Sequence, residues 1–125
     1  SATPAIAPKA NQRGDYLTDD RLAAGNKATL NAAATILKKL ASSTEQPNQY
    51  VLYNLGCIEA KTGNTKQAIE HFSEAIKADK MFAEAYYNRG LLLLEQGEKD
   101  KARQDLSKAG ELGLYKAYAI LKGGF

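Results

Sequence analysis

The chain has 125 residues and a mass of 13.5 kDa, enough for one domain with a modest hydrophobic core. Its longest purely aliphatic run, Leu91–Leu94, is far shorter than the roughly 20 apolar residues that a membrane helix needs, so we expect no membrane insertion. The 17 Lys and Arg against 14 Asp and Glu give a net charge of +3, but the charges alternate in sign and form no basic block, so we expect no nucleic-acid partner. No signal peptide is visible, which leaves both a cytoplasmic location and export after signal removal open.

The N-terminal part of the sequence divides into two segments. Residues 1–14 contain two prolines and no helical stripe, which predicts a flexible arm or linker. Residues 15–48 are predicted to form a degenerate helical hairpin. Apolar residues share one face of a helix over Asn26–Ala41, and Thr18 with two following acidic residues indicates the start of a shorter helix before it. An insertion of four residues, 44–47, then precedes the regular part of the chain.

From residue 49 onward the sequence repeats with a period of 34 residues. Residues 49–82 align with residues 83–116, and a truncated third copy follows at 117–125. Each full copy predicts two helices separated by a turn glycine, and 117–125 predicts a C-terminal capping helix. Asn64 is expected to cap the second helix of its copy, with Gln67 completing a capping box. Seven aligned pairs are identical: Tyr53/Tyr87, Asn54/Asn88, Gly56/Gly90, Gly63/Gly97, Ala68/Ala102, Ser73/Ser107 and Ala75/Ala109.

Small residues inside the predicted helices indicate that paired helices approach closely. A glycine within a helix costs about 1 kcal/mol relative to alanine, so Gly56 is expected to be compensated by a partner helix that packs against it. Ala68 would lie opposite, and Phe72 would fill the space beside Gly56.

These residues resemble the tetratricopeptide repeat. The resemblance rests on Leu55-Gly56 and Ala68…Phe72…Ala75, and in the second copy on Gly90 and Ala102…Leu106…Ala109. It implies an all-α fold, an α-α superhelix of stacked antiparallel helix hairpins with five or six helices and a right-handed course. The sequence departs from the family pattern at three positions, where Glu59 and Leu93 replace a favoured tyrosine and Lys80 replaces a favoured proline.

The resemblance also implies a binding site for a polypeptide. In this family the first helices of successive repeats line a concave groove that holds a peptide or a partner helix. The anchors in such a groove should be less completely buried than the core residues Leu52 and Phe72. Alternatively, the capping helix or the N-terminal arm covers Leu91 and Leu94. The candidate groove residues, carried over by alignment, are Tyr50, Tyr53, Asn54, Lys61, Glu84, Tyr87, Asn88, Leu91, Leu94, Tyr118 and Lys122.

The sequence predicts no catalytic residues, no metal site and no cofactor. Cys57 has no base placed near it and is expected to be a half-buried packing residue, and the single histidine, His71, is expected to point outward into solvent. We therefore expect a non-catalytic protein–protein interaction module, monomeric or weakly self-associating, whose partner is an unidentified polypeptide. The alternative is a structural module for self-association or for packing against other domains of a longer protein.

Overall fold

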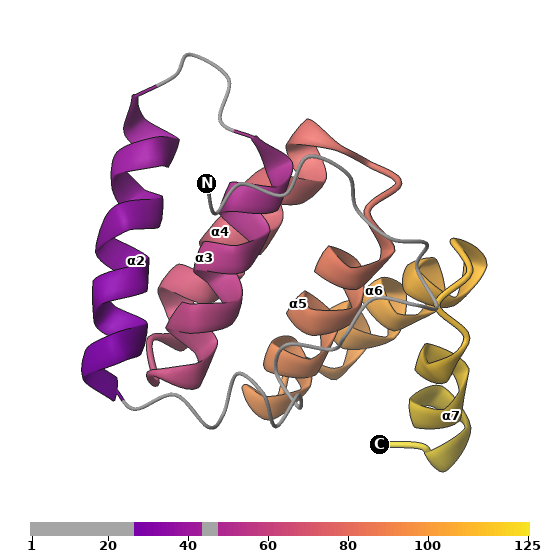
Figure 1. Ribbon diagram of the computed structural model, residues 1–125. Coiled ribbons are helices and arrows are strands. Elements are labelled where there is room, and N and C mark those ends of the chain that lie inside the picture. Colours follow the sequence, from indigo (N-terminus) through magenta and orange to yellow (C-terminus); the bar gives the residue numbers. More distant parts are fainter. Residues whose placement is uncertain (1–26, 44–47) are drawn as a thin grey trace.

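The computed structural model describes residues 27–43 and 48–125. Within these residues the chain forms six helices and no strand, which confirms the all-α fold. Successive helices run in opposite directions and pack side by side, so that they build a single stack (Figure 1). The helices are α2 (Lys27–Ser42), α3 (Gln49–Lys61), α4 (Thr65–Ala78), α5 (Ala83–Glu95), α6 (Lys99–Glu111) and α7 (Lys116–Gly123).

The helix boundaries differ from the predicted ones by one or two residues. The helix expected over 26–41 is α2, and the capping helix expected over 117–125 is α7, which begins at Lys116 and ends at Gly123. The N-terminal arm, the short helix expected near Thr18 and the insertion at 44–47 lie outside the described residues. The division into repeat units and the right-handed course of the stack stay predictions.

Glycines in the left-handed conformation end three of the helices. Gly63, Gly97 and Gly113 have φ values of +85°, +81° and +104°. At each of them the next residue donates its backbone N–H to a carbonyl five residues back, as Asn64 does to Glu59 at 2.7 Å, which is the Schellman arrangement. The predicted capping box is wrong, because the Asn64 side chain makes no cap hydrogen bond and instead donates from Nδ2 to Thr62 Oγ1.

The repeated glycines lie where paired helices approach most closely, as the sequence predicts. A β-carbon built on Gly56 of α3 would lie 2.8 Å from the Phe72 ring of α4. At the equivalent contact one repeat later, a β-carbon on Gly90 of α5 would lie 3.1 Å from Leu106 Cγ of α6. Both contacts are tighter than an alanine accepts without movement of the partner side chain, so glycine lets each hairpin close around its core residue.

The core runs along the stack and is continued at both ends. Phe72 and Leu106 are fully buried in the two central hairpins. Towards the N-terminus, α2 packs Leu30 and Ala34 against Leu55 and Ile58 of α3, and towards the C-terminus α7 packs against α6. None of the helices in 27–43 and 48–125 combines the length and the apolar character needed to cross a membrane.

Candidate partner-binding face

The eleven candidate residues lie on α3, α5 and α7, the first helices of successive hairpins. We call the surface that they form the candidate face. They differ in burial and fall into three groups. Tyr53, Glu84, Tyr87 and Asn88 are buried, Tyr50, Asn54, Lys61, Leu91 and Leu94 are partly exposed, and Tyr118 and Lys122 are exposed.

Tyr53 is the centre of a buried contact between the two full repeats. Its ring centroid lies 4.8 Å from that of Phe82 and 5.6 Å from that of Phe72. Its hydroxyl accepts a hydrogen bond of 2.7 Å from Asn88 Nδ2 on α5. Tyr53 was expected to be less buried than the core, but its exposed fraction of 3% lies between the 4% of Leu52 and the 0% of Phe72. Tyr53 therefore packs as a core residue and holds α5 against α3.

Asn88 contributes a second polar atom to the same place. Its side chain is completely buried, and among the described residues no group donates to its Oδ1. A buried amide oxygen without a donor is costly, by roughly 1–3 kcal/mol. The Tyr53–Asn88 contact thus combines a short hydrogen bond with an amide oxygen, Asn88 Oδ1, that accepts no hydrogen bond from the described residues.

Tyr87 occupies the position of Tyr53 one repeat later, but its neighbour is different. The Phe82 position corresponds to Lys116 after a shift of 34 residues. Lys116 Nζ lies 4.9 Å from the centroid of the Tyr87 ring, the geometry of a cation–π contact. At equivalent positions, the first repeat therefore brings two aromatic rings into contact, and the second brings a ring into contact with an ammonium group.

Partly exposed residues lie beside this buried layer. Tyr50 meets Phe82 edge to face, with ring centroids 5.4 Å apart, and keeps part of its surface in solvent. Leu91 packs against the core cluster shared by α5, α6 and α7 and is also partly exposed, as is Leu94. The candidate face therefore exposes part of one aromatic and two aliphatic side chains, and the buried residues Tyr53, Tyr87 and Asn88 form the layer that we call its floor.

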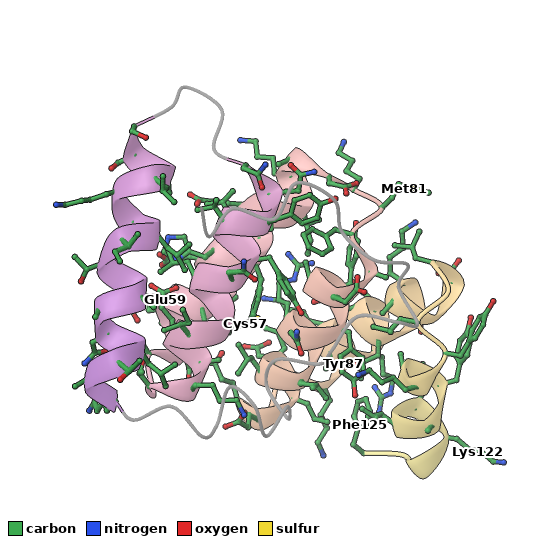
Figure 2. All side chains as sticks on the ribbon, viewed as in Figure 1. Cys57, Glu59, Met81, Tyr87, Lys122 and Phe125 are labelled. Carbon is green, nitrogen blue, oxygen red and sulfur yellow. The ribbon has the colours of Figure 1, made fainter. Side chains whose placement is uncertain are left out.

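The two candidates on α7 lie at the end of the stack. The Tyr118 ring packs on Gly110 of α6, where a β-carbon would come within 2.5 Å of it, and the side chain is still 46% exposed. Lys122 is exposed, and its side chain extends to the edge of the molecule in Figure 2. Lys122 occupies the position of Asn88 one repeat later, and Tyr87 that of Tyr53. Asn88 contacts Tyr53, but the structure does not bring Lys122 against Tyr87.

The position of His71 corrects the sequence prediction. His71 Nδ1 lies 2.5 Å from Oε1 of Glu59, and the side chain of His71 is 23% exposed while that of Glu59 is 4% exposed. The hydrogen bond to Glu59 raises the pKa of His71 above 6.5, and the charges of Glu59 and Glu74 act in the same direction, while burial lowers it. His71 is thus a half-buried partner of a buried carboxylate. Cys57, expected to be half-buried, is 1% exposed.

A second polar contact was missed at the sequence level. Arg89 of α5 donates from Nε and Nη2 to both carboxylate oxygens of Asp105 on α6, at 2.7 and 2.8 Å, and from Nη1 to Ser73 Oγ on α4 at 3.1 Å. The separation of 16 residues is a signal that could have found it, because Gly56 and Phe72 cross their hairpin at the same spacing. The guanidinium therefore joins three consecutive helices.

Within the described residues no group of three or more His, Cys, Asp or Glu side chains is arranged to hold a metal ion. The expectations that the chain has no metal site, no cofactor and no enzyme activity stay predictions.

Comparison with known proteins identifies the repeats. A model of the tetratricopeptide repeat matches residues 53–113. This segment belongs to the tetratricopeptide repeat family. The match covers both hairpins from Tyr53 to the turn after α6, so the polar contacts described above are contacts within and between tetratricopeptide repeats.

Several known proteins are similar to part of this chain. Neutrophil cytosol factor 2 of Bos taurus is 32% identical over 68 residues, which is 54% of this chain and 13% of the relative. The NADPH oxidase activator of Dictyostelium discoideum is 34% identical over 86 residues, 69% of this chain and 13% of the relative. Photosystem I assembly protein Ycf3 of Acaryochloris marina is 30% identical over 60 residues, 48% of this chain and 36% of the relative.

The chain thus spans 13% to 36% of the length of these relatives. They are named as a factor, an activator and an assembly protein.

Proposed function

We propose that this chain is a non-catalytic interaction module that binds a polypeptide along the candidate face. The observation that carries the proposal is the layered construction of that face. A rigid floor of buried Tyr53, Tyr87 and Asn88 supports the partly exposed Tyr50, Leu91 and Leu94. Aromatic and aliphatic anchors on a preorganised surface lower the entropy that binding costs.

The relatives support the same class of function. One is named as an activator of an oxidase and another as an assembly protein, and both names describe proteins that act on other proteins. The chemistry of the face suits an extended or helical segment that places apolar side chains against the leucines. Asn54 and Lys61, which are partly exposed, supply hydrogen bonding at the margin.

A peptide selected from a random phage-displayed library on the immobilised chain tests this proposal. We expect Leu91→Ala and Leu94→Ala to weaken binding of the selected peptide by roughly 1–3 kcal/mol, measured by fluorescence anisotropy, because anchor residues contribute energies of this size. Tyr53→Ala is unsuitable, since that side chain belongs to the core. The matched controls are Lys66→Ala and Lys99→Ala, exposed residues in the first turns of α4 and α6.

Equal affinity of the selected peptides for the leucine variants and the wild type would contradict the proposal. The alternative, a module for self-association, predicts instead that the weight-average mass in sedimentation equilibrium rises with concentration. In that case Leu91→Ala and Leu94→Ala should lower the association constant if the candidate face is the contact.

A further inference from the structure

The two residues that follow α7 fold back onto the stack. Gly124 has a φ of +75° and a ψ of 156°, a conformation that is open almost only to glycine. Its N–H donates to the carbonyl of Leu121 at 3.2 Å. This turn directs Phe125 away from the axis of α7, and in Figure 2 its side chain lies between α7 and the labelled Tyr87 of α5.

Phe125 is held by its ring and by its backbone oxygen. The ring packs against the core cluster shared by α5, α6 and α7, which includes Tyr87 and Leu106. The Arg103 guanidinium of α6 lies 5.1 Å from the ring centroid, the geometry of a cation–π contact. Arg103 Nη2 also donates to the backbone oxygen of Phe125 at 2.8 Å. One guanidinium therefore recognises both the aromatic ring and the carbonyl of the same residue.

The contacts on the two sides of this site differ in how far they depend on Phe125. A β-carbon on Gly123 or Gly124 would meet nothing within 4 Å, so side chains at these positions would pack on nothing and Phe125 supplies the side-chain contact of the segment. Arg103 has a second partner, because its Nη1 lies 2.8 Å from Asp100 Oδ1. When Phe125 leaves, the guanidinium therefore keeps Asp100 as a partner and has Nη2 open to another acceptor.

The site adjoins the candidate face. Tyr87 belongs to the floor of that face and to the cluster that Phe125 contacts, and the partly exposed Leu91 packs against the same cluster. Phe125 also follows Leu91 by 34 residues, so it stands at the equivalent position of the truncated third copy. A polypeptide that lies along the candidate face towards α7 therefore reaches the cluster where Phe125 is seated.

We infer that Arg103 and this cluster form a subsite for an aromatic residue of the bound polypeptide, and that Phe125 fills the subsite as an internal ligand in the free chain. The inference rests on the proposed function and names one side chain that the partner supplies. An aromatic residue of a peptide offers the same two groups as Phe125, a ring for the guanidinium and a carbonyl oxygen for Nη2. The internal ligand lowers the apparent affinity, because only chains whose Phe125 has left can bind.

The peptide acetyl-Gly-Gly-Phe-amide tests the inference, because it reproduces residues 123–125 as a separate molecule. We expect it to bind the Phe125→Ala variant and to shift the NMR amide signals of residues around Arg103 and Leu121 in a saturable way. In the wild type the tethered phenylalanine competes, so the apparent affinity should be roughly tenfold lower or less still. Acetyl-Gly-Gly-Ala-amide is the control peptide and should bind neither protein.

Two double variants test the role of the guanidinium. Arg103→Ala combined with Phe125→Ala should bind the phenylalanine peptide roughly tenfold more weakly than Phe125→Ala alone, since the cation–π contact and a charged hydrogen bond are both lost. Lys101→Ala combined with Phe125→Ala is the matched control and should bind it equally well. Lys101 is an exposed basic residue of the same helix, and like Arg103 it pairs with a carboxylate three residues earlier.

A second way of opening the site keeps the phenylalanine. Gly124→Ala disfavours the turn because alanine rarely adopts its positive φ, and the added methyl group meets no neighbouring atom. This variant should bind the phenylalanine peptide more tightly than the wild type does. Circular dichroism checks that every variant is folded.

Four results would overturn the inference. The first is no saturable binding of the phenylalanine peptide to either opened variant, and the second is equal affinity for these variants and the wild type. The third is equal binding of the alanine peptide, and the fourth is an equal loss of affinity for the Arg103 and Lys101 variants. If any of these occurs while Leu94→Ala still weakens binding of the phage-selected peptides, this inference fails and the proposed function stands.

Discussion

His71 and Glu59 form the ionisable contact between α3 and α4 whose strength should change near neutral pH. The carboxylate is buried and the imidazole is half-buried, so the charged pair is worth more than an exposed one. The pKa of His71 is raised above 6.5 in the folded chain by the hydrogen bond from its ring to Glu59. Protonated His71 therefore stabilises the fold.

The direction of the pH effect follows from linkage. A group whose folded pKa is raised contributes its full stabilisation below its unfolded value of 6.5 and loses it as the pH rises through the folded pKa. We expect the free energy of unfolding to fall as the pH rises through this window above 6.5. Urea unfolding at a series of pH values measures it, and the single histidine signal in an NMR titration reports the pKa of His71 itself.

His71→Gln is the control for this experiment, because glutamine keeps a hydrogen-bonding group and removes the titration. The pH dependence of the wild type minus that of the variant isolates the contribution of His71. Identical slopes in the two proteins would show that the pair contributes nothing to the pH dependence.

At the scale of helices, Arg89 joins α4, α5 and α6 through bonds to Ser73 and Asp105. Its removal leaves Asp105, 6% exposed, without its counter-charge. We expect Arg89→Ala to lower the free energy of unfolding by roughly 2–4 kcal/mol, somewhat below the usual range for a fully buried pair because the guanidinium is 23% exposed. Arg89→Lys should cost less, since it keeps the charge and loses the two-pronged geometry.

Arg103 supplies a control within the same helix layer. Its Nη1 lies 2.8 Å from Asp100 Oδ1, but the exposed fractions are 48% for Arg103 and 92% for Asp100, and its Nη2 donates to the backbone oxygen of Phe125 near the chain end. Arg103→Ala should therefore cost less than about 1 kcal/mol. Chemical denaturation measures both variants, and a cost for Arg89→Ala no larger than that for Arg103→Ala would show that the three-helix contact adds no stability.

The helices themselves were largely predictable, and the polar contacts between them were not. Helical spacing of apolar residues and the turn glycines predict two helices in each full copy, and the predicted bounds of α2 and α7 lie within one or two residues of the observed ones. An apolar stripe marks one buried face of a helix, whereas α4 packs against both α3 and α5 and so buries more than one face. His71 lies beside Phe72 and is half-buried because it contacts Glu59 of α3.

The candidate face shows the same limit. Alignment placed Tyr53 and Tyr87 on the first helices of the hairpins, but their rings contact Phe82, in the turn before α5, and Lys116, the first residue of α7, and the apolar stripe of a single helix does not predict these contacts. Sequence reasoning therefore found the helices that carry the face and misjudged which residues form its floor.

At the scale of the whole molecule, stability should be graded along the stack. The helices α3 to α6 each pack against neighbours on two sides, with α4 and α5 at the centre, whereas in the described part α2 packs chiefly on α3, and α7 chiefly on α6. We expect amide hydrogen exchange to be slowest in α4 and α5 and faster in α2 and α7, because terminal elements open at a lower free energy. Uniform protection from α2 to α7 would show instead that the stack opens only as a single unit.

The change from Phe82 to Lys116 has a consequence for arrays built from this chain. Each 34-residue unit contains its own tyrosine and its own last residue, so a concatemer of residues 49–82 would repeat the Tyr53–Phe82 ring contact at every junction. A concatemer of residues 83–116 would repeat the Tyr87–Lys116 contact and accumulate one ammonium group per junction. Two polymers of equal length would then differ systematically in their response to salt and to heat.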